Sequence, residues 1–170
     1  RQMCIRDSNI SVFESDLQQL EAAGNSAILI FVENQVTAIV GIADTIKDGS
    51  IEAIDSLHKM GLKVAMMTGD NQRTADAIAQ QVGVDAVLAE VLPGDKAAEI
   101  QKLQNDGHVV AMVGDGINDA PALAKADIGI AIGTGTDVAM ASAPVVLISG
   151  DLRGVPKAIS LSRKTLSTIK

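Results

Sequence analysis

Two aspartates and an asparagine lie close together in the run Met112-Val113-Gly114-Asp115-Gly116-Ile117-Asn118-Asp119. The apolar stretch 108–113 predicts a short buried strand. A Gly-Asp-Gly turn ends this strand, because glycine permits positive φ and close approach of the backbone. A helix is expected to begin near Asn118, with Asp119 in its first turn. Asp115, Asn118 and Asp119 therefore meet at the C-terminal end of a strand, where open α/β sheets bind ligands, and their oxygen atoms suit Mg²⁺.

Two further loops place polar groups at the ends of predicted strands. Thr68-Gly69-Asp70-Asn71 follows a strand expected at 63–67, and its hydroxyl and backbone amides offer a phosphate cradle. Leu92-Pro93-Gly94-Asp95-Lys96 follows a strand expected at 85–89 and puts the lysine in the first turn of a helix. A lysine opposes the helix dipole at that position, which indicates another use. Hydroxyl, ammonium and carboxylate groups together are what a phosphoryl site needs.

Each loop also has a purely structural interpretation. Asp115 and the Thr68 loop could close turns, and Asp119 could complement a helix dipole. Lys96 could be a solvated surface lysine. Coincidence explains three polar loops at successive strand ends less easily than one, so a phosphoryl site is the favoured hypothesis. Gly133-Thr134-Gly135-Thr136 lacks the third glycine of a dinucleotide-binding loop and is interpreted as a turn.

The elements that would position these loops alternate regularly from Ser50 onward. Before that residue, 9–23 shows a loose helical pattern, and apolar runs at 26–32 and 36–42 predict a hairpin. Ser50 is expected to cap a helix that ends at Gly61. Further helices and strands are expected at 63–67, 71–82, 85–89, 95–104, 109–113, 128–132, 136–142, 144–148 and from 152 or 155 to 170. Strands separated by helices imply right-handed crossovers, so the predicted fold is a doubly wound, Rossmann-like α/β parallel sheet preceded by a hairpin.

The composition excludes several classes of protein. The chain has 170 residues, a formal net charge of −7, and no Trp or Tyr, which argues against a nucleic-acid partner. A single cysteine, Cys4, excludes an internal disulfide framework. No signal peptide or membrane-spanning stretch is recognised. His58 and His108 lack metal-ligand spacing, and the methionines in the strands are interpreted as core residues.

The three loops together resemble the P-type ATPases, cation pumps of the haloacid dehalogenase superfamily. The matching motifs are Thr68-Gly69-Asp70-Asn71, Lys96 after a proline, and the long run from Gly114 to Leu123. Four stretches resemble the heavy-metal branch, and copper-transporting pumps in particular: 89–93, 133–139, 150–153 and 161–165. The resemblance extends from about residue 9 to residue 170. It implies a haloacid dehalogenase-type fold, the cofactors Mg²⁺ and ATP, and a place on the cytoplasmic face of a membrane.

The resemblance implies roles for the matching positions. Asp115 would hold Mg²⁺ with Asp119 in support, and Thr68, Lys96 and Asp115 would be the catalytic residues. The phosphoryl group would be bound by Thr68, Gly69, Asp70, Lys96 and Asn118.

It also implies a division of the chain. Residues 1–8 match nothing, and 9–43 would end a nucleotide-binding domain. Residues 44–150 would form the phosphorylation domain without the strand that carries its nucleophile, and 151–170 would lead to the next membrane span. Asp44 and Lys47 would lie in the hinge between the two domains.

One departure limits what the chain can do alone. The nucleophilic aspartate of this family lies in Asp-Lys-Thr-Gly-Thr, which is absent, and Asp44-Thr45-Ile46-Lys47 lacks the Gly-Thr. Because an aspartyl-phosphate mechanism requires that carboxylate, the chain alone is not expected to turn over ATP. The implied partners are ATP, a transported copper ion, and the membrane helices and actuator domain of the same polypeptide. Two alternatives remain, namely a soluble phosphatase of the same superfamily and a non-enzymatic regulator that binds Mg²⁺ or a nucleotide.

Overall fold

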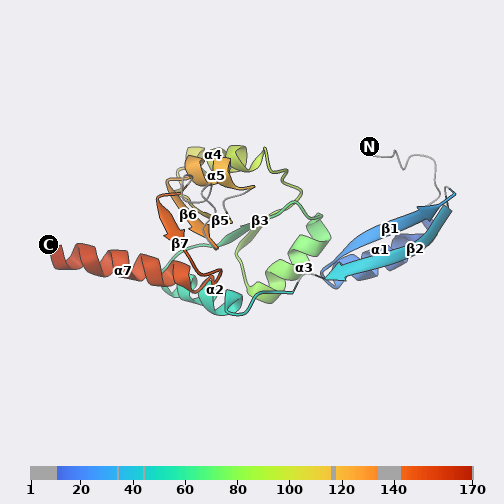
Figure 1. Cartoon of the computed structure of the whole chain (residues 1–170), viewed down its shortest axis with the longest axis horizontal. Helices are drawn as coiled ribbons and strands as arrows, with labels where there is room; N and C mark the ends of the chain where they lie inside the picture. The colour runs from blue at the N-terminus through green and yellow to red at the C-terminus, as the bar shows by residue number, and fades with distance from the viewer. Residues whose placement is uncertain (1–10, 34, 44, 116–117, 134–142, 170) are drawn as a thin grey trace.

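A computed structural model of the chain describes residues 11–33, 35–43, 45–115, 118–133 and 143–169. Helices and strands alternate along most of this length (Figure 1). In chain order the elements are η1 (Ser11–Phe13), α1 (Glu14–Ala22), β1 (Asn25–Val32), β2 (Gln35–Ala43), α2 (Ser50–Lys59), β3 (Ala65–Met67), α3 (Gln72–Val82), β4 (Ala86–Leu88), α4 (Lys96–Asn105), β5 (Ala111–Gly114), α5 (Ala120–Lys125), β6 (Ile128–Ile132), β7 (Val145–Leu147) and α7 (Gly154–Ile169).

The predicted hairpin is confirmed. β1 and β2 pair antiparallel, with Ile28 opposite Val40. With α1 they form a unit that projects from the end of α3 (Figure 1). Hydrogen bonds hold this unit on α3: the buried Thr74 hydroxyl donates to the Asn25 carbonyl at 3.1 Å, and Glu21 accepts from Arg73 at 3.0 Å and from Asn71, the N-cap residue of α3, at 3.2 Å.

The α/β fold class and the parallel pairing are confirmed, but the strands do not form one sheet in the described part of the chain. β3 pairs with β4 in one parallel sheet, and β5, β6 and β7 form another in that order. Within the described ranges β3 and β5 each have a single pairing partner. Met67 of β3 packs against the hydrophobic cluster that contains Met112 of β5. The open edges of β3 and β5 therefore lie in neighbouring regions of the molecule. We call the boundary between these two strands the seam.

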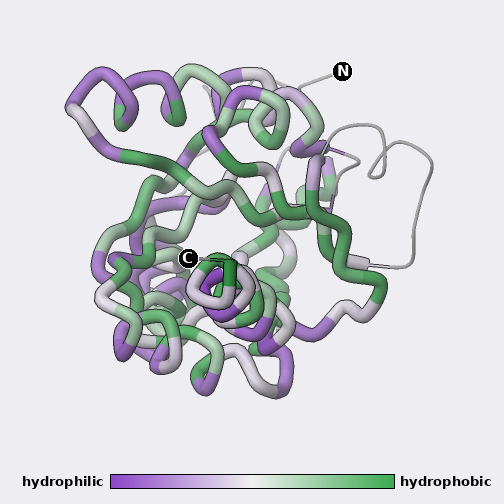
Figure 2. Tube along the Cα trace, turned by 90° about the vertical axis from the view of Figure 1, so that its left-hand side faces the viewer, coloured by the Kyte–Doolittle hydropathy of each residue, from purple (hydrophilic) through white to green (hydrophobic). Residues whose placement is uncertain are grey.

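The main core lies with the second sheet. It is a cluster of six buried residues: Ile100, Met112, Ala122, Leu123, Ala131 and Ala143. Leu123 is 1% exposed, and a Cβ on Gly129 would lie 2.5 Å from its carbonyl oxygen, so β6 and α5 are in direct backbone contact. α7 leads away from this body, and a view along its axis shows hydrophobic and hydrophilic residues on different sides of the helix (Figure 2).

Several predicted helix ends agree with the structure. Asn71 caps α3 by accepting a hydrogen bond from the Thr74 N–H at 3.0 Å, and Gly83 ends the helix with φ 80°. The side chain of Asn and the positive φ of Gly suit these two positions. The predicted helix 136–142, the predicted turn at 134–136, residues 1–8 with Cys4, and Asp44 lie outside the described residues.

Three local predictions were wrong. Gly49, with φ 81°, precedes α2 as its N-cap, so Ser50 is the first helical residue rather than the cap. α5 begins at Ala120 rather than near Asn118, which puts Asp119 at the N-cap position. Val109 is 84% exposed and precedes β5, because this strand extends only over the residues that pair with β6. In the described part of the chain, none of the helices is both long and apolar enough to cross a bilayer.

Candidate phosphoryl-binding site

The loop after β3 is a turn closed by its own side chains. The Thr68 hydroxyl donates to Asp70 Oδ2 at 2.9 Å and accepts from the Asp70 N–H at 3.1 Å. Gly69 is exposed between them, and Asn71 begins α3. The loop is therefore the closed turn of the structural interpretation, and it also leaves Gly69, one of the predicted phosphate-binding residues, on the surface.

A second segment fixes this loop from the side. The Glu90 N–H donates to the Asp70 carbonyl at 2.9 Å, and the Val91 N–H donates to the Thr68 carbonyl at 3.0 Å. Glu90 has φ 57°, a conformation that non-glycine residues adopt mainly where surrounding contacts require it. Sequence analysis did not identify Glu90, because Gly, Asn and Asp are the residues that normally signal positive φ.

Lys96 and Asp119 form an ion pair. Lys96 Nζ lies 2.7 Å from Asp119 Oδ1, and the two side chains are only 16% and 14% exposed. Lys96 is the first residue of α4, which follows β4, whereas Asp119 follows β5. The pair therefore joins loops from the two sheets at the C-terminal ends of their strands. The interpretation of Lys96 as a solvated surface lysine was wrong.

Gly114 gives the Asp119 side chain its position. A Cβ on Gly114 would lie 2.5 Å from Asp119 Oδ2 and 2.8 Å from its Cβ. The close approach predicted for the glycines of this turn is therefore confirmed at Gly114, and Gly116 lies outside the described residues. Because any side chain at Gly114 would displace Asp119, this glycine belongs to the site although it has no functional group.

Asp115 and Asn118 lie in the same loop and are exposed. Mg²⁺ takes one or two carboxylates together with phosphate oxygens and waters, so Asp115 and Asp119 fit this ion. Across the described ranges no group of three or more His, Cys, Asp or Glu side chains could hold a metal.

Two aspartates that sequence analysis missed fix the far ends of the strands that carry the site. We call each of these aspartates, with the hydrogen bonds it accepts, a strand-entry tie. In the first, Asp85 Oδ2 accepts from the Val64 N–H at 2.7 Å and lies 2.9 Å from His58 Nε2. These hydrogen bonds, the Val64 N–H first, hold the pKa of Asp85 below its ordinary value.

In the second strand-entry tie, Asp127 Oδ2 accepts from the Val110 N–H at 2.8 Å and from Gln104 Nε2 at 3.1 Å. Here too the backbone N–H, followed by the side-chain amide, lowers the pKa of the carboxyl.

The predicted residues are thus only partly in mutual contact. The contacts join Thr68 with Asp70 and Lys96 with Asp119. Of the predicted hinge residues, Lys47 is exposed, and its carbonyl accepts from the Ser50 N–H at 3.1 Å.

Comparison with known families identifies the chain. The family model for haloacid dehalogenase-like hydrolases matches residues 4–127. The chain belongs to this family. Among curated relatives, this haloacid dehalogenase-like chain is 53% identical to Copper-transporting ATPase 2 of Rhizobium meliloti (strain 1021), over 100% of the chain and 21% of the relative. It is 58% identical to Probable copper-exporting P-type ATPase V of Mycobacterium tuberculosis (strain ATCC 25618 / H37Rv), over 88% of the chain and 19% of the relative.

Solved structures give the same result for this haloacid dehalogenase-like chain. A zinc-transporting PIB-type ATPase in its E2.Pi state matches with a TM-score of 0.76 and 40% identity, over 96% of the chain and 27% of that structure. The catalytic domain of the CPx-ATPase CopB-B matches with a TM-score of 0.61 and 27% identity, over 77% of the chain and 53% of that structure. The predicted resemblance to heavy-metal P-type ATPases is confirmed, and the chain spans about a fifth of the length of its curated relatives.

Proposed function

We propose that this chain is the cytoplasmic part of a copper-transporting P-type ATPase that supplies the Mg²⁺- and phosphoryl-binding half of an aspartyl-phosphate site. The observation that carries the proposal is the Lys96–Asp119 ion pair, 2.7 Å long, at the C-terminal ends of parallel strands and in the loop that contains Asp115. The pair places a nearly buried cation beside carboxylates, the combination that phosphoryl transfer uses. The names of the curated relatives support copper as the transported ion.

The seam is the proposed place of the missing nucleophile. Among the residues that the structure describes, β3 and β5 have open edges there, whereas parallel sheets are ordinarily buried and paired throughout. A strand from the upstream part of the polypeptide would pair with both edges and complete a single doubly wound sheet. Its C-terminal end would then put an aspartate between the Thr68 loop and the Asp115 loop.

The domain division follows the same proposal. Residues 9–43, whose hairpin forms its own sheet, would end the nucleotide-binding domain, and 44–150 would form the phosphorylation domain with its hinge at Asp44 and Lys47. Residues 151–170 would continue from α7 toward a membrane span, which would place the site on the cytoplasmic face. The remaining membrane helices and actuator domain would belong to the same polypeptide.

In the complete pump, the aspartate on the added strand would attack the γ-phosphorus of ATP, and ADP would leave. Lys96 would release Asp119 and neutralise charge on the transferred phosphoryl group, with Asn118 beside it. The Thr68 hydroxyl would turn from Asp70 Oδ2 and donate to a phosphoryl oxygen together with the Gly69 N–H, while the Asp70 N–H, which donates to the Thr68 hydroxyl, would keep the loop closed. Mg²⁺, when bound at Asp115 and Asp119, would supply positive charge to the phosphate oxygens.

Asp115→Asn in the full-length pump tests this proposal. We expect phosphoenzyme formation from ATP to fall by about 100-fold, the scale on which loss of one charge-stabilising group slows a reaction. Asp127→Asn is the matched control, because Asp127 precedes β6 and so lies at the opposite end of the same sheet. Normal phosphoenzyme formation by Asp115→Asn would show that the assigned role is wrong.

A further inference from the structure

Arg153, which directly precedes α7, contacts Asp151 in its own loop and Glu52 in α2. Its Nη2 lies 2.8 Å from Asp151 Oδ2 and its Nε 3.0 Å from Asp151 Oδ1, so both oxygens of this carboxylate hold one edge of the guanidinium. The same carboxylate accepts from the Arg153 backbone N–H at 2.9 Å. The remaining nitrogen, Nη1, lies 3.3 Å from Glu52 Oε2 in α2. Arg153 therefore has a fixed orientation and connects the start of α7 with the first turn of α2.

The arginine side chain also lies directly on the backbone of Gly49. A Cβ at Gly49 would be 2.7 Å from Arg153 Nε and 3.0 Å from its Cδ. Gly49 has φ 81° and forms the N-cap of α2. It ends the segment 45–49, which enters the domain from β2 and which we call the entry segment. Only glycine satisfies both the backbone angle and the space that Arg153 leaves, so the entry segment is shaped to receive this arginine.

The position of this cation is not one that helix stability favours. A positive charge beside a helix N-terminus opposes the helix dipole, and Asp151 and Glu52 offset that effect. The side chain of Arg153 is 42% exposed and that of Glu52 is 68% exposed, so solvent weakens their attraction. The contacts of Arg153 therefore contribute more to the placement of the entry segment than to the stability of the fold.

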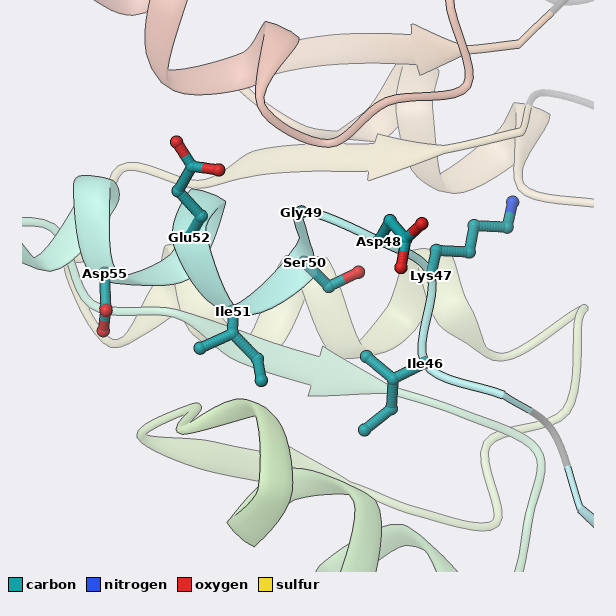
Figure 3. A pocket seen from close by; sticks show the side chains of 8 residues that line it. All are labelled: Ile46, Lys47, Asp48, Gly49, Ser50, Ile51, Glu52 and Asp55. Carbon is teal, nitrogen blue, oxygen red and sulfur yellow. The ribbon is translucent and has the colours of Figure 1, made fainter.

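The surroundings of the entry segment give it little other support. An open cavity of about 530 Å³ is lined by Ile46, Lys47, Asp48, Gly49, Ser50, Ile51, Glu52 and Asp55. Glu52 points toward the red segment that leads into α7, whereas Ile46 and Ile51 point the other way (Figure 3). Gly49 and Glu52, the two residues that Arg153 contacts, thus lie among the residues that line this cavity.

α2 lies along α7 and is held to it at both ends. Arg153 contacts Gly49 and Glu52 where α2 begins, and Arg163 Nη1 lies 3.4 Å from the Met60 carbonyl where α2 ends. The two helices therefore run side by side in the same direction. A displacement of the entry segment would move α2 and α7 together, and the exposed second half of α7 would carry that displacement away from the domain (Figure 1).

We propose that Arg153 is a positioning residue that locks the entry segment and α2 onto α7, so that movement of the hinge is transmitted along α7. The inference rests on the proposed function, in which the hinge connects to the nucleotide-binding domain and α7 connects to the membrane. Arg153 lies in a different segment from the phosphoryl-binding residues. It would therefore connect the hinge to α7 without taking part in the chemistry.

The test uses the full-length pump with Arg153→Ala, Arg153→Lys and Glu52→Gln. Phosphoenzyme formation from ATP and metal-stimulated ATP turnover are measured on each variant. We expect Arg153→Ala to form phosphoenzyme at the normal level and to lose about tenfold in metal-stimulated turnover, within the usual range for coupling between sites. Arg153→Lys should regain part of the turnover, because a lysine keeps the charge but not the bidentate contact with Asp151. Glu52→Gln should lose less of the metal-stimulated turnover than Arg153→Ala.

Arg163→Ala is the matched control, because Arg163 also joins α7 to α2 but at the end far from the entry segment. It should leave both measurements near the wild-type values. An equal loss of phosphoenzyme and turnover in Arg153→Ala would indicate a merely structural role and overturn the inference, as would turnover at the wild-type level. If the unsubstituted pump forms no phosphoenzyme, the proposed function fails first, and this outcome is distinct from the others.

Discussion

The sheet β3–β4 and the sheet β5–β6–β7 follow the same plan at their edges but differ in their interiors. In each sheet, the strand next to the seam (β3 or β5) ends at the candidate site. The residue before or near the start of that strand, Val64 or Val110, donates its N–H to an aspartate, Asp85 or Asp127, that precedes the neighbouring strand. Such hydrogen bonds to a carboxylate are charge-assisted and therefore stronger than neutral ones. The two strand-entry ties thus set the register of the strands beside the seam, at the ends far from the chemistry.

The difference lies in what stands behind each strand. The second sheet has three strands and the main hydrophobic cluster with Leu123, whereas the buried residues of α3, which packs against β4, are mostly small, with Val82 the largest aliphatic one. The second sheet is therefore close to self-sufficient. The first sheet therefore depends more on whatever pairs with it across the seam.

Leu123→Ala should have the largest effect on the isolated chain. The loss in the free energy of unfolding should be about 2–5 kcal/mol, the usual range for leucine truncation in a core. Val82→Ala, on the side of the first sheet, should cost roughly 1.5 kcal/mol because fewer methylene groups leave the core. Urea unfolding measures both values. Leu161→Ala, at a residue 67% exposed, should leave the stability unchanged, and equal losses at Leu123 and Val82 would contradict the difference between the sheets.

Gly114→Ala and Gly69→Ala compare the two site loops. Alanine at Gly114 would overlap Asp119 and break its contact with Lys96, so we expect a loss of about 1–3 kcal/mol. At Gly69 the nearest atom to a Cβ would be 3.6 Å away, an ordinary contact, and the loss should be below roughly 0.5 kcal/mol. Thermal unfolding gives the ranking, and a reversed order would show that the loop after β5 is less tightly packed than described.

Asp127→Asn and Asp85→Asn test the strand-entry ties through their dependence on pH. Each carboxyl has a folded-state pKa below its ordinary value of 3.8, so it stabilises the fold fully above that value and loses this contribution as the pH falls through the folded pKa. Both variants should therefore lower the melting temperature at pH 7 and have a much smaller effect well below pH 3.8. The same difference from the wild type at both pH values would rule out the ionised carboxylates as the source.

His58→Gln should have the smallest effect. The substitution gives Asp85 a glutamine amide as side-chain partner, as Asp127 has in Gln104. Asp85 keeps its hydrogen bond from the Val64 N–H, and only the imidazole is replaced. We expect a small change in melting temperature at pH 7 and an acid-unfolding profile little altered from the wild type. A large loss would mean that His58, and not the backbone N–H, is the main partner of Asp85.

Local chemistry allowed the sequence to predict most of the elements. Asn71 and Gly83 mark the two ends of α3, and the apolar run of β6 was predicted at the residues that form it. Ser50 failed as a cap because the preceding glycine already supplies the N-cap with a positive φ. The contact of the Arg153 side chain with Gly49 comes from a distant part of the chain and has no local signal.

The candidate site was predictable in its residue types but not in its contacts. Lys96 and Asp119 were each identified, yet their pairing depends on α4 and α5 lying side by side. Strand patterns alone did not predict the division into two sheets, because a pattern shows that a strand exists and not whether its partner is present. The absence of Asp-Lys-Thr-Gly-Thr, however, predicted that a central strand of the sheet is missing. Asp85 and Asp127 were missed because an aspartate before a strand is also a common turn residue.

The most direct test of the account is the in-frame coding sequence on both sides of this segment. The account predicts an upstream Asp-Lys-Thr-Gly-Thr, which would supply the strand for the seam, and an apolar run of roughly 20 residues downstream of α7. An in-frame start codon near Met3 together with a stop codon directly after Lys170 would contradict it, because no strand of the same polypeptide could then complete the sheet.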